Sequence, residues 1–142
     1  MTLHFPETAG DALNDGHDRP TRPALIRGWQ CLCPNCGKGA LLHHYLKVTE
    51  KCAVCGTDFT PQRADDGPAY MTILVVGHIV TPLLYFVFVT YRPTPIYMAF
   101  GFSALTIVLA LFLLPRFKGM FVALQWAKRM HGFGSGPEPV LD

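Results

Sequence analysis

Residues 67–115 read GPAYMTILVVGHIVTPLLYFVFVTYRPTPIYMAFGFSALTIVLALFLLP, and this stretch decides the fold. Its one charged residue, Arg92, separates two uncharged blocks, 67–91 and 95–115. A helix of about 20 residues crosses the hydrocarbon core of a bilayer, which is roughly 30 Å thick. Pro93 lies in the short linker and Pro95 begins the second block, which is typical of a turn. The sequence therefore predicts two transmembrane helices joined as a hairpin.

The overall composition agrees with a membrane protein. The 142 residues are 50% apolar and 15% charged, whereas soluble domains carry about 25% charged residues. Outside the two blocks little chain remains for a catalytic core, and we find no nucleophile–base pair and no phosphate-binding glycine loop. The net charge of +2 is too small for a nucleic-acid footprint. We therefore expect neither an enzyme nor a nucleic-acid-binding protein.

Two C-x-x-C-G units precede the hairpin, at residues 33–37 and 52–56. Four cysteine thiolates at this spacing close a tetrahedron around one metal ion and leave no position open for substrate, which is typical of a structural zinc site. Iron is the alternative metal, and two disulfides are the alternative chemistry if the cysteines face an oxidising compartment. The predicted metal ligands are Cys33, Cys36, Cys52 and Cys55.

Three further residues near these units are candidate ligands or redox groups. Cys31 would point to the same side as Cys33 on an extended segment, and it is either an accessory thiol or an ordinary half-buried cysteine. His43 and His44 lie between the two units, but four sulfurs already complete the shell. The apolar layer of a small zinc ribbon of short β-strands is expected from Leu41, Leu42, Tyr45, Leu46, Val48 and Phe59.

Lysine and arginine predict the orientation of the hairpin, because cytoplasmic segments retain them. The linker has one such residue, the segment before the hairpin has seven and the segment after it has four. Two crossings put both flanks on the same side, so we expect both termini in the cytoplasm. A reducing cytoplasm favours a metal over disulfides.

The ends of the helices and the remaining segments follow from local signals. Asp66 precedes Gly67 and Pro68, so we expect helix 1 to start near residue 67 with the Asp66 carboxylate as its cap. Residues 116–132 mix aromatic with basic side chains and predict an interfacial amphipathic helix, the alternative being a continuation of the second crossing past Pro115. The full division is a disordered tail (1–23), a zinc-ribbon head (24–66), transmembrane helices (67–91 and 95–115), the interfacial helix (116–132) and a second disordered tail (133–142).

His78 is a polar residue inside the first crossing, which is costly and marks a candidate functional position. In an even hairpin, the residue at the same depth on the return helix is near Thr106. We predict a hydrogen bond between His78 and Thr106, the alternative being a contact of His78 with a ligand or a partner protein.

Several of these motifs together resemble the DUF983 family of short bacterial membrane proteins. They are Arg27-Gly28, Cys33-Pro34-Asn35-Cys36-Gly37-Lys38-Gly39, the second cysteine unit, Asp66-Gly67-Pro68-Ala69-Tyr70 and Val76-Gly77-His78-Ile79-Val80. The resemblance covers residues 23–132. It implies a zinc-ribbon head on a two-helix anchor in the bacterial inner membrane, with a role in the biogenesis of haem-copper oxidases.

Two classes of function remain open on the sequence alone. The first is a non-enzymatic accessory protein that rests in the lipid bilayer and docks another membrane protein, such as an oxidase subunit or an assembly factor. The second is a protein that handles a labile metal ion or haem through Cys31, His43, His44 or His78. We favour the first, because four cysteines fill the metal shell without those residues.

Overall fold

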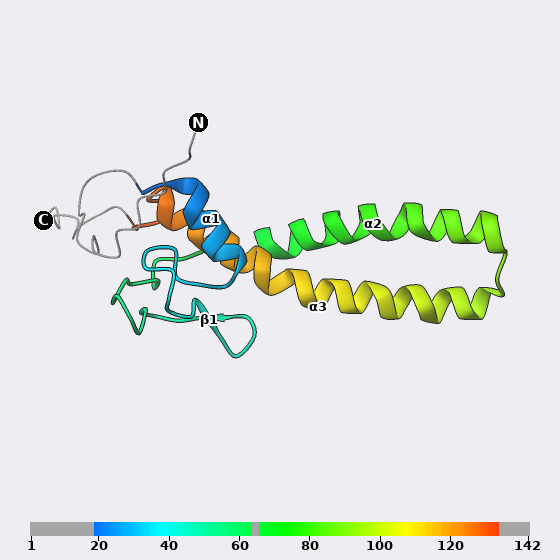
Figure 1. The fold of residues 1–142 in the computed structure, drawn as a ribbon, viewed down its shortest axis with the longest axis horizontal. Coiled ribbons are helices and arrows are strands. Elements are labelled where there is room, and N and C mark those ends of the chain that lie inside the picture. Colours follow the sequence, from blue (N-terminus) through cyan, green and yellow to red (C-terminus); the bar gives the residue numbers. More distant parts are fainter. Residues whose placement is uncertain (1–18, 64–65, 134–142) are drawn as a thin grey trace, which may run out of the picture.

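The computed structural model describes residues 19–63 and 66–133 of the chain. In order along the sequence, the elements are α1 (Thr21–Trp29), β1 (Leu42–His43), β2 (Lys47–Val48), α2 (Gly67–Tyr91) and α3 (Pro95–Ala127). Figure 1 shows α2 and the first part of α3 side by side as a long hairpin, with the other elements gathered at one end of it. We call residues 19–63 the head.

The hairpin consists of two helices that are long and apolar enough to cross a membrane. α2 begins at Gly67, where the sequence predicts its start, and its C-cap residue Arg92 adopts a left-handed conformation with φ of 41°. The predicted side-chain cap is wrong, because the Asp66 carboxylate makes no capping hydrogen bond. Asp66 has helical rather than extended backbone angles, and its main-chain carbonyl instead accepts the N–H of Tyr70 at 2.9 Å.

α3 continues through Pro115 to Ala127, so a separate interfacial helix over 116–132 is not formed. Proline has no N–H, and Pro115 therefore leaves the carbonyl of Leu111 without its helical partner. The Tyr45 hydroxyl of the head donates a hydrogen bond to that carbonyl. The head thus supplies the donor that Pro115 removes from α3.

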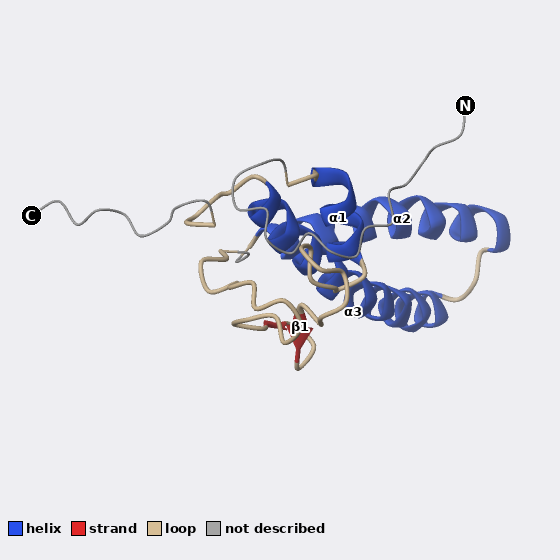
Figure 2. Cartoon of the chain, turned by 60° about the vertical axis from the view of Figure 1, so that its left-hand side comes forward, coloured by secondary structure: helices blue, strands red, loops and turns tan. Residues whose placement is uncertain are grey.

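The last part of α3 is covered by protein. Phe117, Val122 and Trp126 are buried there, and Figures 1 and 2 both place α1 beside this part of α3. Two glycines make the close approach possible, because a Cβ on Gly28 would come within 2.5 Å of the Ala123 Cβ, and a Cβ on Gly119 would overlap the Gly28 carbonyl.

The head and α3 share one small core. β1 and β2 form an antiparallel pair in which Leu42 faces Val48. Of the predicted apolar layer, Leu41, Val48 and Phe59 are buried while Tyr45 is exposed. The residues of the shared core are Ala24, Cys33, Leu41, Val48, Cys52, Phe59, Val122, Trp126 and Phe133.

Each predicted tail overlaps residues that belong to the folded structure. Residues 21–23 belong to α1, and Phe133 is buried against the Phe59 ring with 6.4 Å between the ring centroids. Arg19 donates to the carbonyls of Trp126 and Phe133 at 2.9 and 3.1 Å. Contacts across the fold therefore order these segments, which the local composition could not reveal. The rest of both tails, 1–18 and 134–142, lies outside the described residues.

Candidate metal centre

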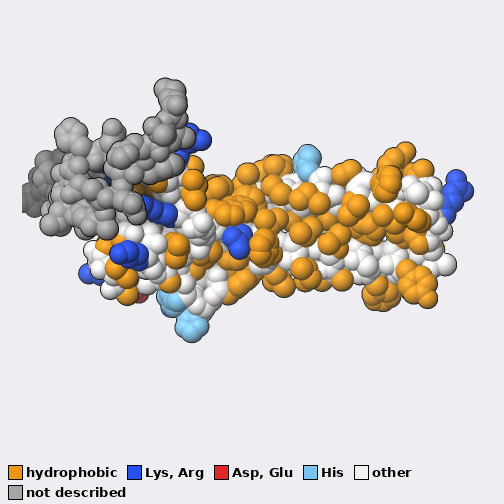
Figure 3. Space-filling view, viewed as in Figure 1, with side chains coloured by type: hydrophobic (Ala, Val, Ile, Leu, Met, Phe, Trp, Pro, Cys, Tyr) orange, Lys and Arg blue, Asp and Glu red, His pale blue; other side chains and the backbone are white. Residues whose placement is uncertain are grey.

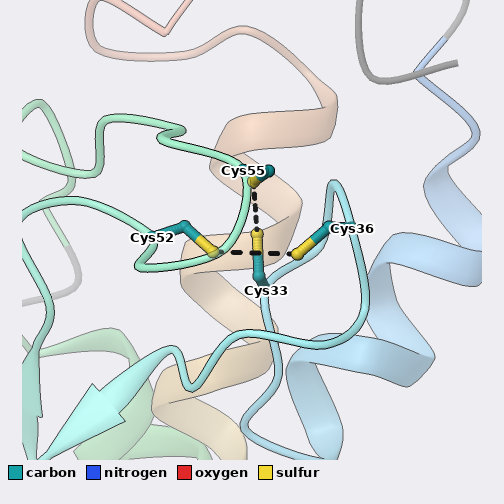
Figure 4. A group of neighbouring side chains, drawn as sticks. All are labelled: Cys33, Cys36, Cys52 and Cys55. Atoms are coloured by element: carbon teal, nitrogen blue, oxygen red, sulfur yellow. Dashed lines mark hydrogen bonds between the residues drawn. The ribbon is translucent and has the colours of Figure 1, made fainter. Parts of the chain in front are cut away.

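The four cysteines of the two C-x-x-C-G units converge in the head. Their sulfur atoms all lie within 4.8 Å of one another, so they form a group that can bind a metal ion. Figure 4 shows the side chains pointing toward a common centre from two separate loops. The sulfurs of Cys33 and Cys55 are 3.6 Å apart, and those of Cys36 and Cys52 are 3.7 Å apart.

These separations fit a tetrahedral metal site. A Zn–S bond of about 2.3 Å gives tetrahedral S···S edges of about 3.8 Å, and a ferric or ferrous tetrathiolate has a similar size. All five cysteines of the chain are free thiols in the structure. The type of ligand also fits zinc or iron, because sulfur ligands bind these metals in preference to magnesium and calcium.

A glycine shapes each cysteine loop. Gly37 and Gly56 have φ of 68° and 74°, a conformation that side chains rarely tolerate. It allows the Gly37 N–H to reach the Cys33 carbonyl at 2.8 Å and the Gly56 N–H to reach that of Cys52 at 2.9 Å. Both loops are therefore closed turns that present two sulfurs to the same side.

Hydrogen bonding differs among the four thiols. Burial alone would raise the pKa of Cys55, but hydrogen bonds from the hydroxyl and main chain of Thr57 lower that pKa to about 6. Burial is likewise outweighed at Cys36, where the backbone N–H groups of Gly39 and Lys38 lower the thiol pKa. At Cys33 burial dominates and raises the pKa. The more exposed pair thus favours the thiolate form that a metal requires.

Neighbouring residues hold the first loop in place. The Arg27 guanidinium of α1 donates to the carbonyls of Pro34 and Asn35 at 3.0 and 2.9 Å. The Asn35 amide donates to the Thr57 hydroxyl at 2.9 Å, which links the first loop to the second. Gly39 is needed for space, since a Cβ there would overlap the Cys52 sulfur. Such outer contacts fix the direction of metal ligands.

The other candidate ligands lie outside this group. Within the described part of the chain, the metal-competent cluster contains neither Cys31 nor His43 nor His44. The Cys31 thiol instead faces the Pro115 carbonyl at 3.6 Å, and burial raises its pKa against the opposing charge of Arg116. Cys31 has φ of 60°, so the segment is not extended and its side chain does not follow that of Cys33.

The predicted hydrogen bond between His78 and Thr106 is wrong. His78 Nδ1 lies 2.7 Å from the Leu74 carbonyl, and the Thr106 hydroxyl donates to the Phe102 carbonyl at 2.7 Å, so both of these atoms bond within their own helix. The buried residue Val76 shows which side of α2 is covered. His78 is two positions further on, about 200° around the helix, and is exposed. Equal depth on two helices therefore does not put two side chains on facing sides.

Sequence reasoning missed the residues that fasten the head to the hairpin. Tyr45 appeared as an apolar layer residue, whereas its hydroxyl serves α3. Gln125 is buried and forms two hydrogen bonds of 2.9 Å with the main chain of Arg63. The close contact between α1 and α3 could have been predicted from Gly28 and Gly119, because a glycine inside an otherwise helical segment often marks a close approach of two backbones.

The fold and site define a class of protein: a small head with a four-cysteine cluster, attached to two long apolar helices. The sequence model of the family described as "Protein of unknown function (DUF983)" matches residues 42–126. The chain belongs to this family. The match includes the second cysteine unit and both long helices but begins after the first unit. No curated protein and no solved structure matches the chain.

Proposed function

We propose that the chain is a non-enzymatic, membrane-anchored accessory protein whose head is built around a structural zinc ion. The main support for this proposal is the group of four cysteine sulfur atoms, which all lie within 4.8 Å of one another. Four protein thiolates complete the coordination of zinc, which leaves no position for a substrate. The binding energy of such a site then contributes to the folding of the head.

The surface of the hairpin supports insertion into a bilayer. Side chains such as Phe86, Phe100 and Val108 are 59%, 72% and 64% exposed, and Figure 3 shows an apolar surface along the whole hairpin. Water-soluble proteins rarely expose so large a patch. Tyr91 is the last residue of α2 and Tyr97 lies in the first turn of α3, and both are exposed, as in the aromatic belts of membrane proteins.

The proposed location is the bacterial inner membrane with both termini in the cytoplasm. The distribution of lysine and arginine favours this orientation, since one lies in the linker and eleven flank the hairpin. The cysteines are then in a reducing compartment, where a metal site is stable and disulfides are rare.

The proposed role is to present a rigid head at the membrane surface to another membrane protein. The head is joined to α3 by the shared core, the glycine contact and Tyr45, so its position above the bilayer is fixed. Assistance to oxidase biogenesis is the form of this role that the family resemblance implies. Among the described residues, the group that could hold a metal ion contains none of Cys31, His43, His44 and His78. The labile-metal alternative is therefore not preferred.

The test begins with the full-length protein purified in mild detergent. We expect one zinc ion per chain by elemental analysis, a colourless protein, and copurification of a membrane-protein partner. A strong chelator should release the zinc and expose the head to protease while the hairpin stays helical by circular dichroism. Haem absorbance, bound copper, or release of the metal without loss of protease resistance would overturn the proposal.

A further inference from the structure

Two polar side chains of α2 face away from the rest of the protein at the depth of the membrane. His78 and Thr81 are both exposed, and they border a shallow groove with Gly77 and Leu74. They lie on the side of α2 opposite to Val76, which is buried. In a bilayer this face would meet lipid, where unpaired polar groups are costly.

The Thr81 hydroxyl is an unpaired hydrogen-bond donor. Thr72 and Thr106 each donate to the carbonyl four residues earlier, both at 2.7 Å. In the described structure Thr81 makes no such bond, although it also lies inside a helix. Its hydroxyl hydrogen is therefore available to a group outside the chain.

The outward nitrogen of His78 is an unpaired acceptor. Its Nδ1 atom lies 2.7 Å from the Leu74 carbonyl, and because a carbonyl only accepts, Nδ1 carries the hydrogen. A neutral imidazole then has its lone pair on Nε2. Nothing in the described part of the chain donates to that atom, so His78 and Thr81 together present a free acceptor and a free donor.

Gly77 lets a second helix come close to this face. A Cβ added at Gly77 would meet nothing within 4 Å, so the glycine is not needed for packing within the chain. Gly77 and Thr81 are four residues apart and form the small-x-x-x-small pattern that lets membrane helices approach closely.

We propose that this face of α2 binds the same face of a second copy of the chain. Two copies with the same orientation in one membrane place their α2 helices parallel, with His78 at equal depths. A two-fold axis beside Gly77 then pairs the Thr81 hydroxyl of each copy with His78 Nε2 of the other, as an isologous interface requires. The face is its own complement, because it supplies both the donor and the acceptor.

This inference rests on the membrane insertion included in the proposed function. The first test compares Gly77→Leu with the matched variant Gly101→Leu, in full-length protein reconstituted into phosphatidylcholine vesicles. Both glycines are in the hairpin helices, and a Cβ at either meets nothing within 4 Å. Energy transfer between two fluorescently labelled preparations measures self-association. We expect association of the parent protein and of Gly101→Leu, and its loss in Gly77→Leu.

The second test addresses the reciprocal hydrogen bonds. His78→Leu or Thr81→Val should each weaken dimerisation roughly fivefold to tenfold, because either change removes both bonds of the pair. The double variant should be no weaker than either single one, since no bond remains to be lost. Thr81→Ser keeps the hydroxyl and should associate like the parent.

Contradicting results are separable from a failure of the proposed function. A monomeric parent protein, or association unchanged in Gly77→Leu, would overturn the dimer. Additive losses from His78→Leu and Thr81→Val would overturn the reciprocal pairing. If Gly77→Leu instead prevents copurification of a different membrane protein, the face belongs to that partner. Extraction of the chain from membranes by alkaline carbonate would refute the insertion itself.

Discussion

Each cysteine loop depends on a glycine that places two sulfurs on one side. Gly37 and Gly56 provide the left-handed backbone, and Gly39 leaves room for the Cys52 sulfur. The cluster is therefore determined by the spacing of cysteines together with the glycines between and after them. Arg27 adds a link from α1 to the first loop, so the metal centre and the helix support each other.

Serine substitutions separate the ligands from the remaining cysteine. Cys36→Ser and Cys55→Ser should each lose the metal and the protease resistance of the head, because a neutral hydroxyl is a poor replacement for a thiolate. Cys31→Ser should keep both, since its thiol lies outside the cluster. Elemental analysis and limited proteolysis of the purified proteins provide the measurement. A full metal content in both ligand variants would refute the assignment.

The pair of Tyr45 and Pro115 gives a second prediction at the residue scale. Tyr45→Phe should destabilise the docked head by about 1–3 kcal/mol, because it leaves the Leu111 carbonyl without a donor. In a Pro115→Ala background, the N–H of the new alanine can bond to the Leu111 carbonyl within α3. Tyr45→Phe should then cause a smaller loss of stability. Thermal unfolding of the head followed by Trp29 and Trp126 fluorescence measures both effects. An equal loss of stability from Tyr45→Phe in the parent protein and in Pro115→Ala would mean that the hydrogen bond does not couple Tyr45 to Pro115.

At the scale of elements, α1 and α3 depend on close contact between their backbones. The crossing point consists of Gly28 and Gly119, where neither position has space for a Cβ. The last part of α3 is consequently a packing surface for the head, although its basic residues suggest a helix lying on lipid. α3 continues past Pro115 to Ala127 along this packing surface.

Alanine substitutions at two glycines of α3 should differ in their effect on the stability of the protein. Gly119→Ala should destabilise the head by about 1–3 kcal/mol through overlap with the Gly28 carbonyl. Gly101→Ala has free space around its Cβ and should be neutral or stabilising by up to about 1 kcal/mol, since alanine favours helices. Both values come from thermal unfolding in the same detergent. A tolerated Gly119→Ala would refute the tight crossing.

At the scale of the whole molecule, the head packs against one end of the hairpin, with the four-cysteine cluster at that end. The cluster shares its core with α3, because Cys33 and Cys52 are packed together with Val122 and Trp126. Loss of the metal is therefore expected to loosen the junction with the hairpin as well as the loops.

The sidedness of the protein is testable in intact cells. A probe attached at Thr94 should react with a membrane-impermeant reagent, whereas probes at Gly10 and Ser135 should be protected until the membrane is permeabilised. The physical reason is the excess of lysine and arginine in the flanks of the hairpin. The opposite labelling pattern would place the cysteines outside and favour disulfides over a metal.

The sequence by itself determined the two long apolar helices and the four-cysteine group. Both depend on local properties: unbroken apolar runs of membrane length, and cysteines with glycines at fixed spacing. The start of α2 at Gly67 also follows from such a local signal.

Only the tertiary structure decided how these parts are joined. The Leu111 carbonyl, which Pro115 leaves without a helical donor, is satisfied by the hydroxyl of Tyr45, 66 residues away in the sequence. The order of residues 19–23 and Phe133 required contacts with α3 and the head. The outward direction of His78 followed from which face of α2 is covered. These features depend on contacts between distant segments, and a local pattern carries no information about the partner in such a contact.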